Sequence, residues 1–123
     1  GLPDELLPEV VVSEESVPPT LNDKVLAERV MTRWNGHFGE GVLFSGERLG
    51  MGAEDFPIFT IDPYIPSLYF AVGGTPLEDF ARERAGGPPV PSHHSPLFKI
   101  EPDASVTLGV EASVTALLDL LGS

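Results

Sequence analysis

The sequence contains no cysteine and only seven lysine and arginine residues among its 123 residues. Without cysteine, the chain has no disulfide, no cysteine-ligated zinc site and no thiol nucleophile. The lack of cysteine is compatible with a reducing compartment, so a cytoplasmic location is the default expectation, while a periplasmic location stays open.

The shortage of basic residues excludes two classes of partner. Aspartate and glutamate number 19, which gives a formal net charge of −12. Affinity for nucleic acids comes mainly from lysine and arginine that release condensed counterions, and anionic membrane surfaces also attract basic segments. We therefore expect neither nucleic acid nor membrane as a partner. Long apolar runs are missing as well, since no stretch approaches the roughly 18 to 20 uninterrupted apolar residues that span a bilayer.

Apolar residues are nevertheless plentiful and are arranged as in a folded domain. They make up 41% of the chain, which is enough for the core of a single domain of this length. The 13 glycines and 13 prolines gather at 86–91 and elsewhere separate short apolar runs, as turns do.

Two long helices are predicted from apolar periodicity. The first covers about 23–37, where apolar residues recur every fourth position after a capping Asn22 or Asp23, namely at Leu26, Val30, Trp34 and Phe38. The second begins at Pro102 and runs to about Leu121, with one apolar stripe formed by Val106, Val110, Val114, Leu117 and Leu121. We expect Trp34, Phe38, Val110 and Leu117 to be core residues.

Three apolar runs predict β-strands, at 9–16, 42–44 and 67–72. The run at 67–72 is apolar on both faces and ends at Gly73-Gly74, so we expect it to be a central strand. A helix that is apolar over most of its circumference, such as 102–121, is expected to pack on a sheet. The predicted fold class is therefore α/β, a mixed sheet flanked by helices.

Two further segments complete the expected layout. Ala53 to Thr60 reads as a short helix, with Glu54 and Asp55 in its first turn, where negative charge is favourable. Residues 75–101 are expected to form a long irregular stretch, and such stretches in small domains are usually functional or disordered.

The three histidines are the candidate metal ligands. His93 and His94 are adjacent and lie between Pro91 and Pro96. Neighbouring side chains of an extended segment point in opposite directions, so we expect only one of the two rings to face a given metal. A pair of surface histidines is the alternative. His37 stands alone after a helix, where an exposed or capping role is expected.

Two other patterns are weak as functional sites. Glu54 and Asp55 resemble paired carboxylates, but adjacent helical residues diverge by about 100°, so they complement the helix dipole or orient a neighbouring ligand. Gly73-Gly74 follows a strand without the glycine spacing or the lysine of a phosphate-binding loop, so it is expected to end the strand.

Four segments, taken in order, carry a resemblance to a known family. They are PEVVVSEESVPPTLND (8–23), MGAEDFPIF (51–59), SLYFAVGG (67–74) and HHSPLFKIEPDASVTLGVEASVTALLDLL (93–121). Together they resemble the C-terminal part of the dinuclear metal amidohydrolases of metallopeptidase family twenty, which includes hippurate hydrolase, N-acyl-amino-acid amidohydrolases and aminoacylase. The resemblance covers nearly the whole chain, although no single motif is specific by itself.

The resemblance implies a division of the chain and one site residue. Residues 1–19 correspond to the end of the family's lid or dimerisation domain and the return linker, and residues 20–123 to the C-terminal part of its catalytic domain. The family's ligand is the histidine two residues before a proline, which here is His94. His93 has no matching role, and GAEDF at 52–56 supports the metal centre.

The implied activity is hydrolysis of an amide bond in an N-acyl amino acid or small peptide. The implied cofactors are two divalent ions, zinc first, with manganese, cobalt or nickel as alternatives. The other ligands and the catalytic glutamate correspond to the family's N-terminal half, which lies outside this chain, so the isolated chain is expected to be inactive. A homo-oligomer is expected. The alternative is a non-catalytic binding or assembly domain of the same fold.

Overall fold

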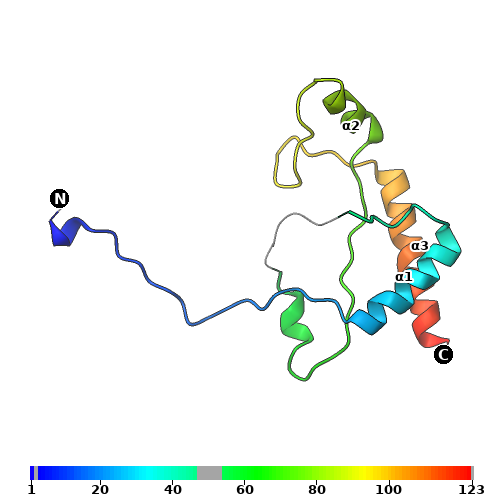
Figure 1. The fold of residues 1–123 in the computed structure, drawn as a ribbon, viewed down its shortest axis with the longest axis horizontal. Coiled ribbons are helices and arrows are strands. Elements are labelled where there is room, and N and C mark those ends of the chain that lie inside the picture. The colour runs from blue at the N-terminus through cyan, green and yellow to red at the C-terminus, as the bar shows by residue number, and fades with distance from the viewer. Residues whose placement is uncertain (2, 47–53, 123) are drawn as a thin grey trace.

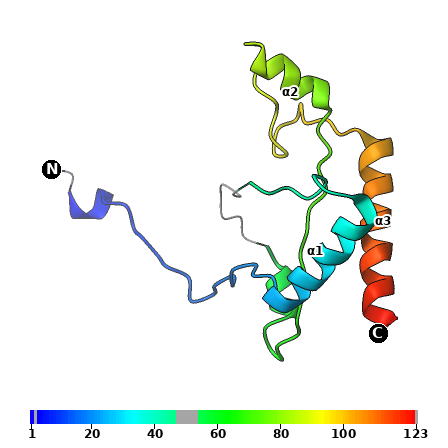
Figure 2. The same cartoon turned by 45° about the vertical axis from the view of Figure 1, so that its right-hand side comes forward.

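The computed structural model describes residue 1, residues 3–46 and residues 54–122. Its helical elements follow the chain in this order: η1 (Asp4–Leu6), α1 (Lys24–Phe38), η2 (Phe56–Phe59), α2 (Leu77–Arg84) and α3 (Pro102–Leu121). Figure 1 shows α1 and α3 crossing at one side of the molecule, α2 at one end, and the N-terminal stretch reaching away from the rest. Figure 2 gives the same arrangement from a second direction.

Helix α1 confirms the helix predicted from the spacing of four. Asp23 caps its start, because the Asp23 Oδ1 atom accepts a hydrogen bond of 2.8 Å from the Leu26 backbone N–H. The helix ends at Gly39, whose φ of 85° is costly for residues with a Cβ atom. Val30 and Trp34 are buried, and Leu26 and Phe38 pack against them.

Helix α3 is confirmed as well, but a different part of its surface is buried. Its buried residues are Ala112 and Thr115, and the Trp34 Nε1–H donates to the Ala112 carbonyl oxygen at 2.9 Å. Val110 and Leu117, which we expected in the core, are 58% and 54% exposed. The reason is that α1 meets α3 over its small residues, so the valine and leucine stripe lies outside this contact.

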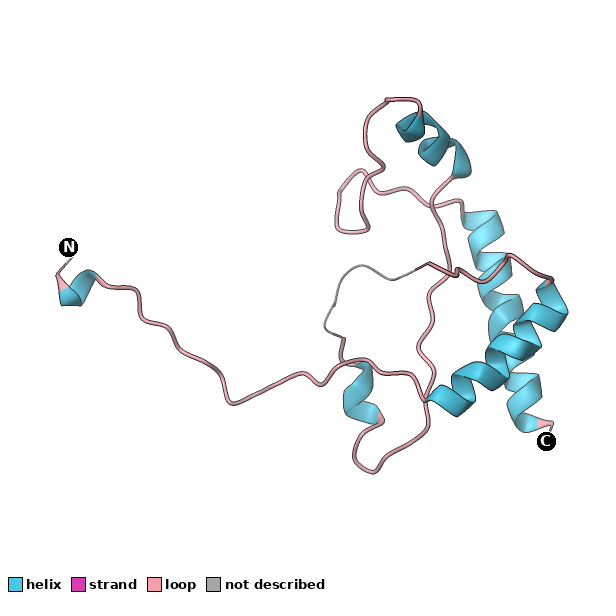
Figure 3. Ribbon diagram, in the orientation of Figure 1, coloured by secondary structure: helices cyan, strands magenta, loops and turns pink. Residues whose placement is uncertain are grey.

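The predicted α/β fold is wrong for the part of the chain that the structure describes. Figure 3 contains no strand there, and the nearest feature is an isolated bridge between Ile61 and Tyr64. A strand exists only where its backbone groups pair with a neighbour in a regular ladder. Helices satisfy those groups internally, which is why the two predicted long helices are present and the predicted sheet is not.

The expected central strand, 67–72, is an extended segment that pairs with no other strand in the described residues. The Asp23 N–H donates to the Ser67 carbonyl at 2.9 Å, and the Asn22 side chain both donates to the Tyr69 carbonyl and accepts from its N–H. Phe70 contacts Trp34 edge-on at 4.8 Å, whereas Tyr69 faces the other way, toward Phe56 at 5.4 Å. The side chains therefore alternate as in a strand, without the partner strands that would make a sheet.

The other two predicted strands are also absent. Residues 9–16 lie in the extended N-terminal stretch, where Val10 and Val12 are 83% and 85% exposed, and residues 42–44 form no ladder. The expected division at residues 19 and 20 remains a prediction, since no observation bears on it.

Two helical segments differ from expectation. The helix predicted for 53–60 is the shorter 3₁₀ element η2, with Ala53 outside the described residues. The stretch 75–101, expected to be irregular, contains α2. Glu78 and Asp79 in the first turn of α2 and Arg82 and Arg84 in its last turn complement the helix dipole. This order of charges, acidic residues first and basic residues last, indicates a helix and is visible in the sequence.

One helix in the described residues is long and apolar enough to cross a membrane, judged by length and composition alone. This is α3, whose most apolar 18-residue window has a mean hydropathy of 1.5 and is mostly unburied. Core helices of soluble proteins can meet the same criteria. In this chain α3 is joined to α1 by the Trp34 hydrogen bond and by an ion pair between Arg29 and Asp119.

Candidate functional site

His93 and His94 lie side by side on a tight turn in the loop between α2 and α3. The turn is closed by a 2.9 Å hydrogen bond from the Ser95 N–H to the Ser92 carbonyl. The centroids of the two imidazole rings are 4.2 Å apart, with an angle of 47° between the ring planes. The expectation that the rings point to opposite sides is therefore wrong, because it assumed an extended backbone and the backbone here is a turn.

His94 is exposed and is accessible to a metal ion. Within the described residues its ring contacts the ring of His93 and makes no hydrogen bond. A neutral imidazole with a free nitrogen is a suitable donor for zinc, manganese, cobalt or nickel. The residue therefore fits the role of a single metal ligand.

A complete metal centre is not assembled by the described residues. They contain no group of three or more histidine, cysteine, aspartate or glutamate side chains placed to hold one ion. Structural and catalytic zinc sites in proteins use three or four protein ligands. The described part of this chain therefore does not form a complete metal centre by itself.

Glu54 and Asp55 are not brought to the histidine pair. Both are exposed and precede η2, and the Asp55 side chain makes no cap hydrogen bond to that element. Figures 1 and 2 show η2 and the loop after α2 at opposite ends of the extended segment that joins them. The rest of the expected supporting motif, Gly52 and Ala53, lies outside the described residues.

His37 is exposed, as expected, in the last turn of α1. Its Nε2 atom is 3.9 Å from a carboxylate oxygen of Glu111, and its ring contacts Phe38 edge-on at 4.7 Å. This is one imidazole beside one carboxylate at the crossing of α1 and α3, away from the His93–His94 turn.

Gly73 and Gly74 were expected to end a strand, and that expectation is wrong because the described residues 67–74 form no strand. The Gly74 carbonyl accepts a hydrogen bond of 2.6 Å from the Glu101 N–H. A Cβ atom on Gly74 would lie 3.1 Å from a methyl carbon of Ile100. The close approach of the segment before α3 explains why glycine stands here.

Asp23 and Tyr64 form a polar contact that the sequence reasoning did not single out. The Tyr64 hydroxyl donates to the Asp23 Oδ2 atom at 2.6 Å, while Oδ1 of the same carboxylate caps α1. The Tyr64 hydrogen bond, followed by that from Leu26, lowers the pKa of Asp23 below its ordinary value of 3.8. The same bond raises the pKa of Tyr64. Asp23 thereby ties the loop at Tyr64 to the start of α1.

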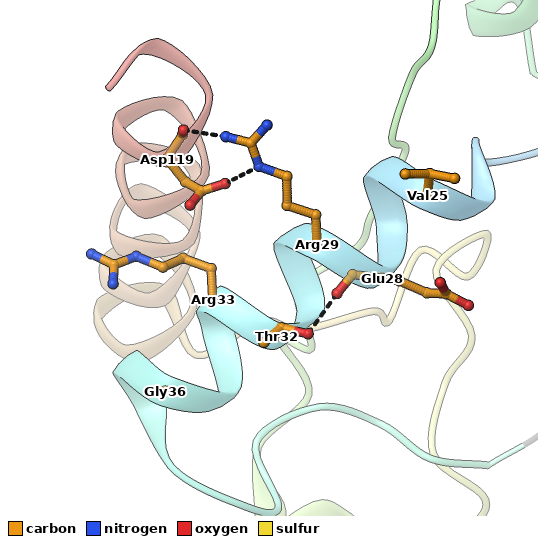
Figure 4. A pocket seen from close by; sticks show the side chains of 7 residues that line it. All are labelled: Val25, Glu28, Arg29, Thr32, Arg33, Gly36 and Asp119. Atoms are coloured by element: carbon orange, nitrogen blue, oxygen red, sulfur yellow. Dashed lines mark hydrogen bonds and ion pairs between the residues drawn. The ribbon is translucent and has the colours of Figure 1, made fainter. Parts of the chain in front are cut away.

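An open groove lies between α1 and α3, with a volume of about 590 Å³. Figure 4 shows Arg29 reaching Asp119, where its Nε donates to the carboxylate at 2.6 Å and its Nη2 to the backbone carbonyl at 2.5 Å. Arg33 leaves the next turn of α1 on the same side. The described residues that line the groove include no histidine, so it is separate from the candidate metal ligands.

A second cavity, about 410 Å³, is mainly apolar. It lies between α1, residues 42–44 and residues 68–73, and its aromatic lining includes Trp34, Phe38, Phe44 and Phe70. The described lining contains no histidine and no carboxylate. It therefore offers shape and apolar surface, but no metal ligand or carboxylate base.

Comparison of the chain with family models, with curated proteins and with solved structures finds no match.

Proposed function

We propose that this chain contributes His94 as one metal ligand to a dinuclear metal-dependent hydrolase that cleaves amide bonds of N-acyl amino acids or small peptides. The observation that carries the proposal is the HHSPLF segment at 93–98, whose second histidine, two residues before Pro96, is exposed on a turn. A ligand histidine must be accessible and held in place, and the turn meets both requirements.

The turn is held by more than one hydrogen bond. Ser95 accepts at two atoms: its side-chain oxygen receives the Leu97 N–H at 3.2 Å, and its carbonyl receives the Phe98 N–H at 3.0 Å. These bonds fix the backbone directly after His94, so a ligand there does not have to be ordered when the ion binds. Ordering a flexible ligand loop would weaken binding.

The chemistry of the proposed centre divides between this chain and the rest of the enzyme. When bound, two divalent ions, zinc first and otherwise manganese, cobalt or nickel, would supply Lewis-acid chemistry at an amide carbonyl and a more acidic water molecule. The role of His94 is to hold one ion through a ring nitrogen. The remaining ligands and the glutamate that moves the proton are proposed to lie outside this chain, so no catalytic residue is assigned within it.

The direct test compares two proteins under the same assay. The protein encoded by the complete reading frame should hydrolyse N-acyl amino acids when zinc or manganese is supplied, and the 123-residue chain alone should not. Hydrolysis by the purified 123-residue chain would contradict the proposed division of ligands. Failure of the protein from the complete frame to hydrolyse N-acyl amino acids or small peptides would contradict the proposed activity.

A non-catalytic binding or assembly domain is the second candidate. It is favoured by the broad apolar surface that α3 exposes, at Val106, Val110, Val114, Leu117, Leu118 and Leu121. Exposed apolar patches of this kind usually mark interaction surfaces. Under this reading the protein from the complete frame binds partners or copies of itself and has no hydrolase activity.

A further inference from the structure

We infer that His93 and His94 together bind one divalent transition-metal ion, such as Zn²⁺, within this chain and without a ligand from elsewhere. The resemblance gives His93 no role, so this inference goes beyond the proposed function. It begins from the observation that the two rings lie on the same side of a turn, 4.2 Å apart between centroids.

The separation of the rings suits a shared ion. Zinc binds imidazole nitrogen at about 2.0–2.1 Å, so two imidazoles on one ion place their ligating nitrogens about 3 Å apart. Neighbouring histidines in an extended segment cannot meet this condition, because their rings diverge. In the turn at 92–95 the ring centroids are already 4.2 Å apart, so rotation of the two side chains can direct one nitrogen of each ring to a common point.

The surroundings of the pair leave room for an ion and for water. Both residues are exposed, and within the described residues neither ring makes a hydrogen bond that an ion would have to replace. Water molecules can complete the coordination of an ion that has two protein ligands. Imidazole favours zinc, nickel or copper over magnesium, whose preferred ligands are oxygen atoms.

The third histidine provides a matched control within the same chain. His37 is also exposed, and it lies beside the Glu111 carboxylate instead of a second imidazole. If the acidic chain attracted zinc only through its net charge of −12, or through single histidines, His37 would matter as much as the pair. The proposed two-histidine site requires instead that His37 contributes little to zinc binding.

The experiment is a titration of the 123-residue chain with Zn²⁺, followed by calorimetry and by NMR of the histidine rings. Wild-type chain is expected to bind one ion, with shifts at both His93 and His94. His93→Ala and His94→Ala should each weaken binding about tenfold or more, because the second imidazole of a linked pair binds at high effective concentration. His37→Ala should bind as the wild type does, and Mg²⁺ should not compete.

Three results would overturn the inference: no zinc binding by the wild-type chain, wild-type affinity in His93→Ala, or an equal loss in His37→Ala. All substitutions are at exposed positions, and an unchanged helical circular dichroism signal shows that the fold is intact. The outcome is separate from that of the proposed function. In the complete centre other ligands would join His94, so a hydrolase could exist with or without the two-histidine site.

Discussion

Among single residues, Trp34 connects the two long helices from a buried position. It is 5% exposed, and its indole N–H donates to the Ala112 carbonyl in α3. A buried carbonyl in the middle of a helix already accepts one bond from its own helix, and the indole uses the remaining acceptor capacity. The ring thus supplies both apolar burial and a directional contact.

Replacing Trp34 by Phe should lower the free energy of unfolding by about 1–3 kcal/mol, through the lost hydrogen bond and the space left by the smaller ring. Urea denaturation followed by helical circular dichroism measures the change. Val25→Ala, at a position exposed on α1, serves as the control and should change stability by less than about 0.5 kcal/mol. Equal effects of the two substitutions would show that the α1–α3 contact does not depend on the indole.

Asp23 gives the fold a dependence on pH in the acidic range. Its pKa is lowered in the folded chain, first by the Tyr64 hydroxyl and then by the Leu26 N–H, so the folded state favours the carboxylate. A group with a lowered pKa contributes stability above its unfolded value, and that contribution is lost as pH falls through the folded value. We therefore expect the contribution of Asp23 to be complete above about pH 4 and to be lost progressively as the pH falls below that value.

The pH dependence can be measured by comparison with Asp23→Asn, which keeps a good helix cap but does not titrate. Between about pH 5 and pH 3 the urea midpoint of the wild type should fall further than that of Asp23→Asn. Tyr64→Phe removes the largest cause of the shift and should give an intermediate fall. If the urea midpoints of all three proteins fell equally over this pH range, the role of this carboxylate would be refuted.

Among the structural elements, α1 offers two glycines with opposite expected effects. Gly36 lies inside the helix, and a Cβ atom there would meet nothing within 4 Å, whereas Gly39 ends the helix at a φ of 85°. Gly36→Ala should raise the free energy of unfolding by about 0.5–1 kcal/mol, because alanine is the better helix former. Gly39→Ala should lower it by about 1 kcal/mol, because alanine disfavours positive φ. Thermal unfolding of the two variants measures both changes. If both substitutions raised, or both lowered, the free energy of unfolding, the helix end at Gly39 would be contradicted.

The elements also show which parts of the fold were predictable. The periodicity and caps of α1 and α3 depend on residues close in sequence, so both helices were predicted correctly with their ends. The run at 67–72 has the composition of a central strand, but pairing depends on partners that local sequence does not specify. In the structure its hydrogen bonds within the described residues go to Asn22 and Asp23 and not to a neighbouring strand, and the sheet that we predicted is absent from those residues.

The candidate site was predictable in part for the same reason. The residues HHSP identify a histidine two residues before a proline, and the structure places His94 on an exposed turn. The side-by-side arrangement of the two rings was missed because alternation was assumed for a segment that forms a turn. The Asp23–Tyr64 contact spans 41 positions in sequence, so no local pattern indicates it.

For the whole molecule, the main feature is apolar surface that no described part of the chain covers. Val110 and Leu117 of α3 are more than half exposed, although the chain carries a net charge of −12. Burial of apolar surface contributes about 25 cal/mol for each Å² removed from water, so α3 favours association. The charge opposes association of identical chains, and the opposition weakens in salt.

We expect the chain to self-associate, increasingly with salt, and the double substitution Val110→Glu and Leu117→Glu to reduce this strongly. Sedimentation equilibrium at two salt concentrations measures the effect. Leu77→Glu is the control, because Leu77 is also highly exposed but lies on α2. A wild-type chain that stays monomeric at high salt, or an equal effect of the control, would contradict association through α3.

The proposed role of His94 is to hold a metal ion in a dinuclear hydrolase. The most direct test compares the His94→Ala and His93→Ala variants of the protein from the complete reading frame. For each variant, the content of bound metal and the rate of N-acyl amino acid hydrolysis are measured. We predict that His94→Ala loses bound metal and at least about 100-fold in rate, while His93→Ala keeps both metals and changes the rate far less. Retention of both metals by His94→Ala, with loss in His93→Ala, would show that the ligand has been assigned to the wrong histidine.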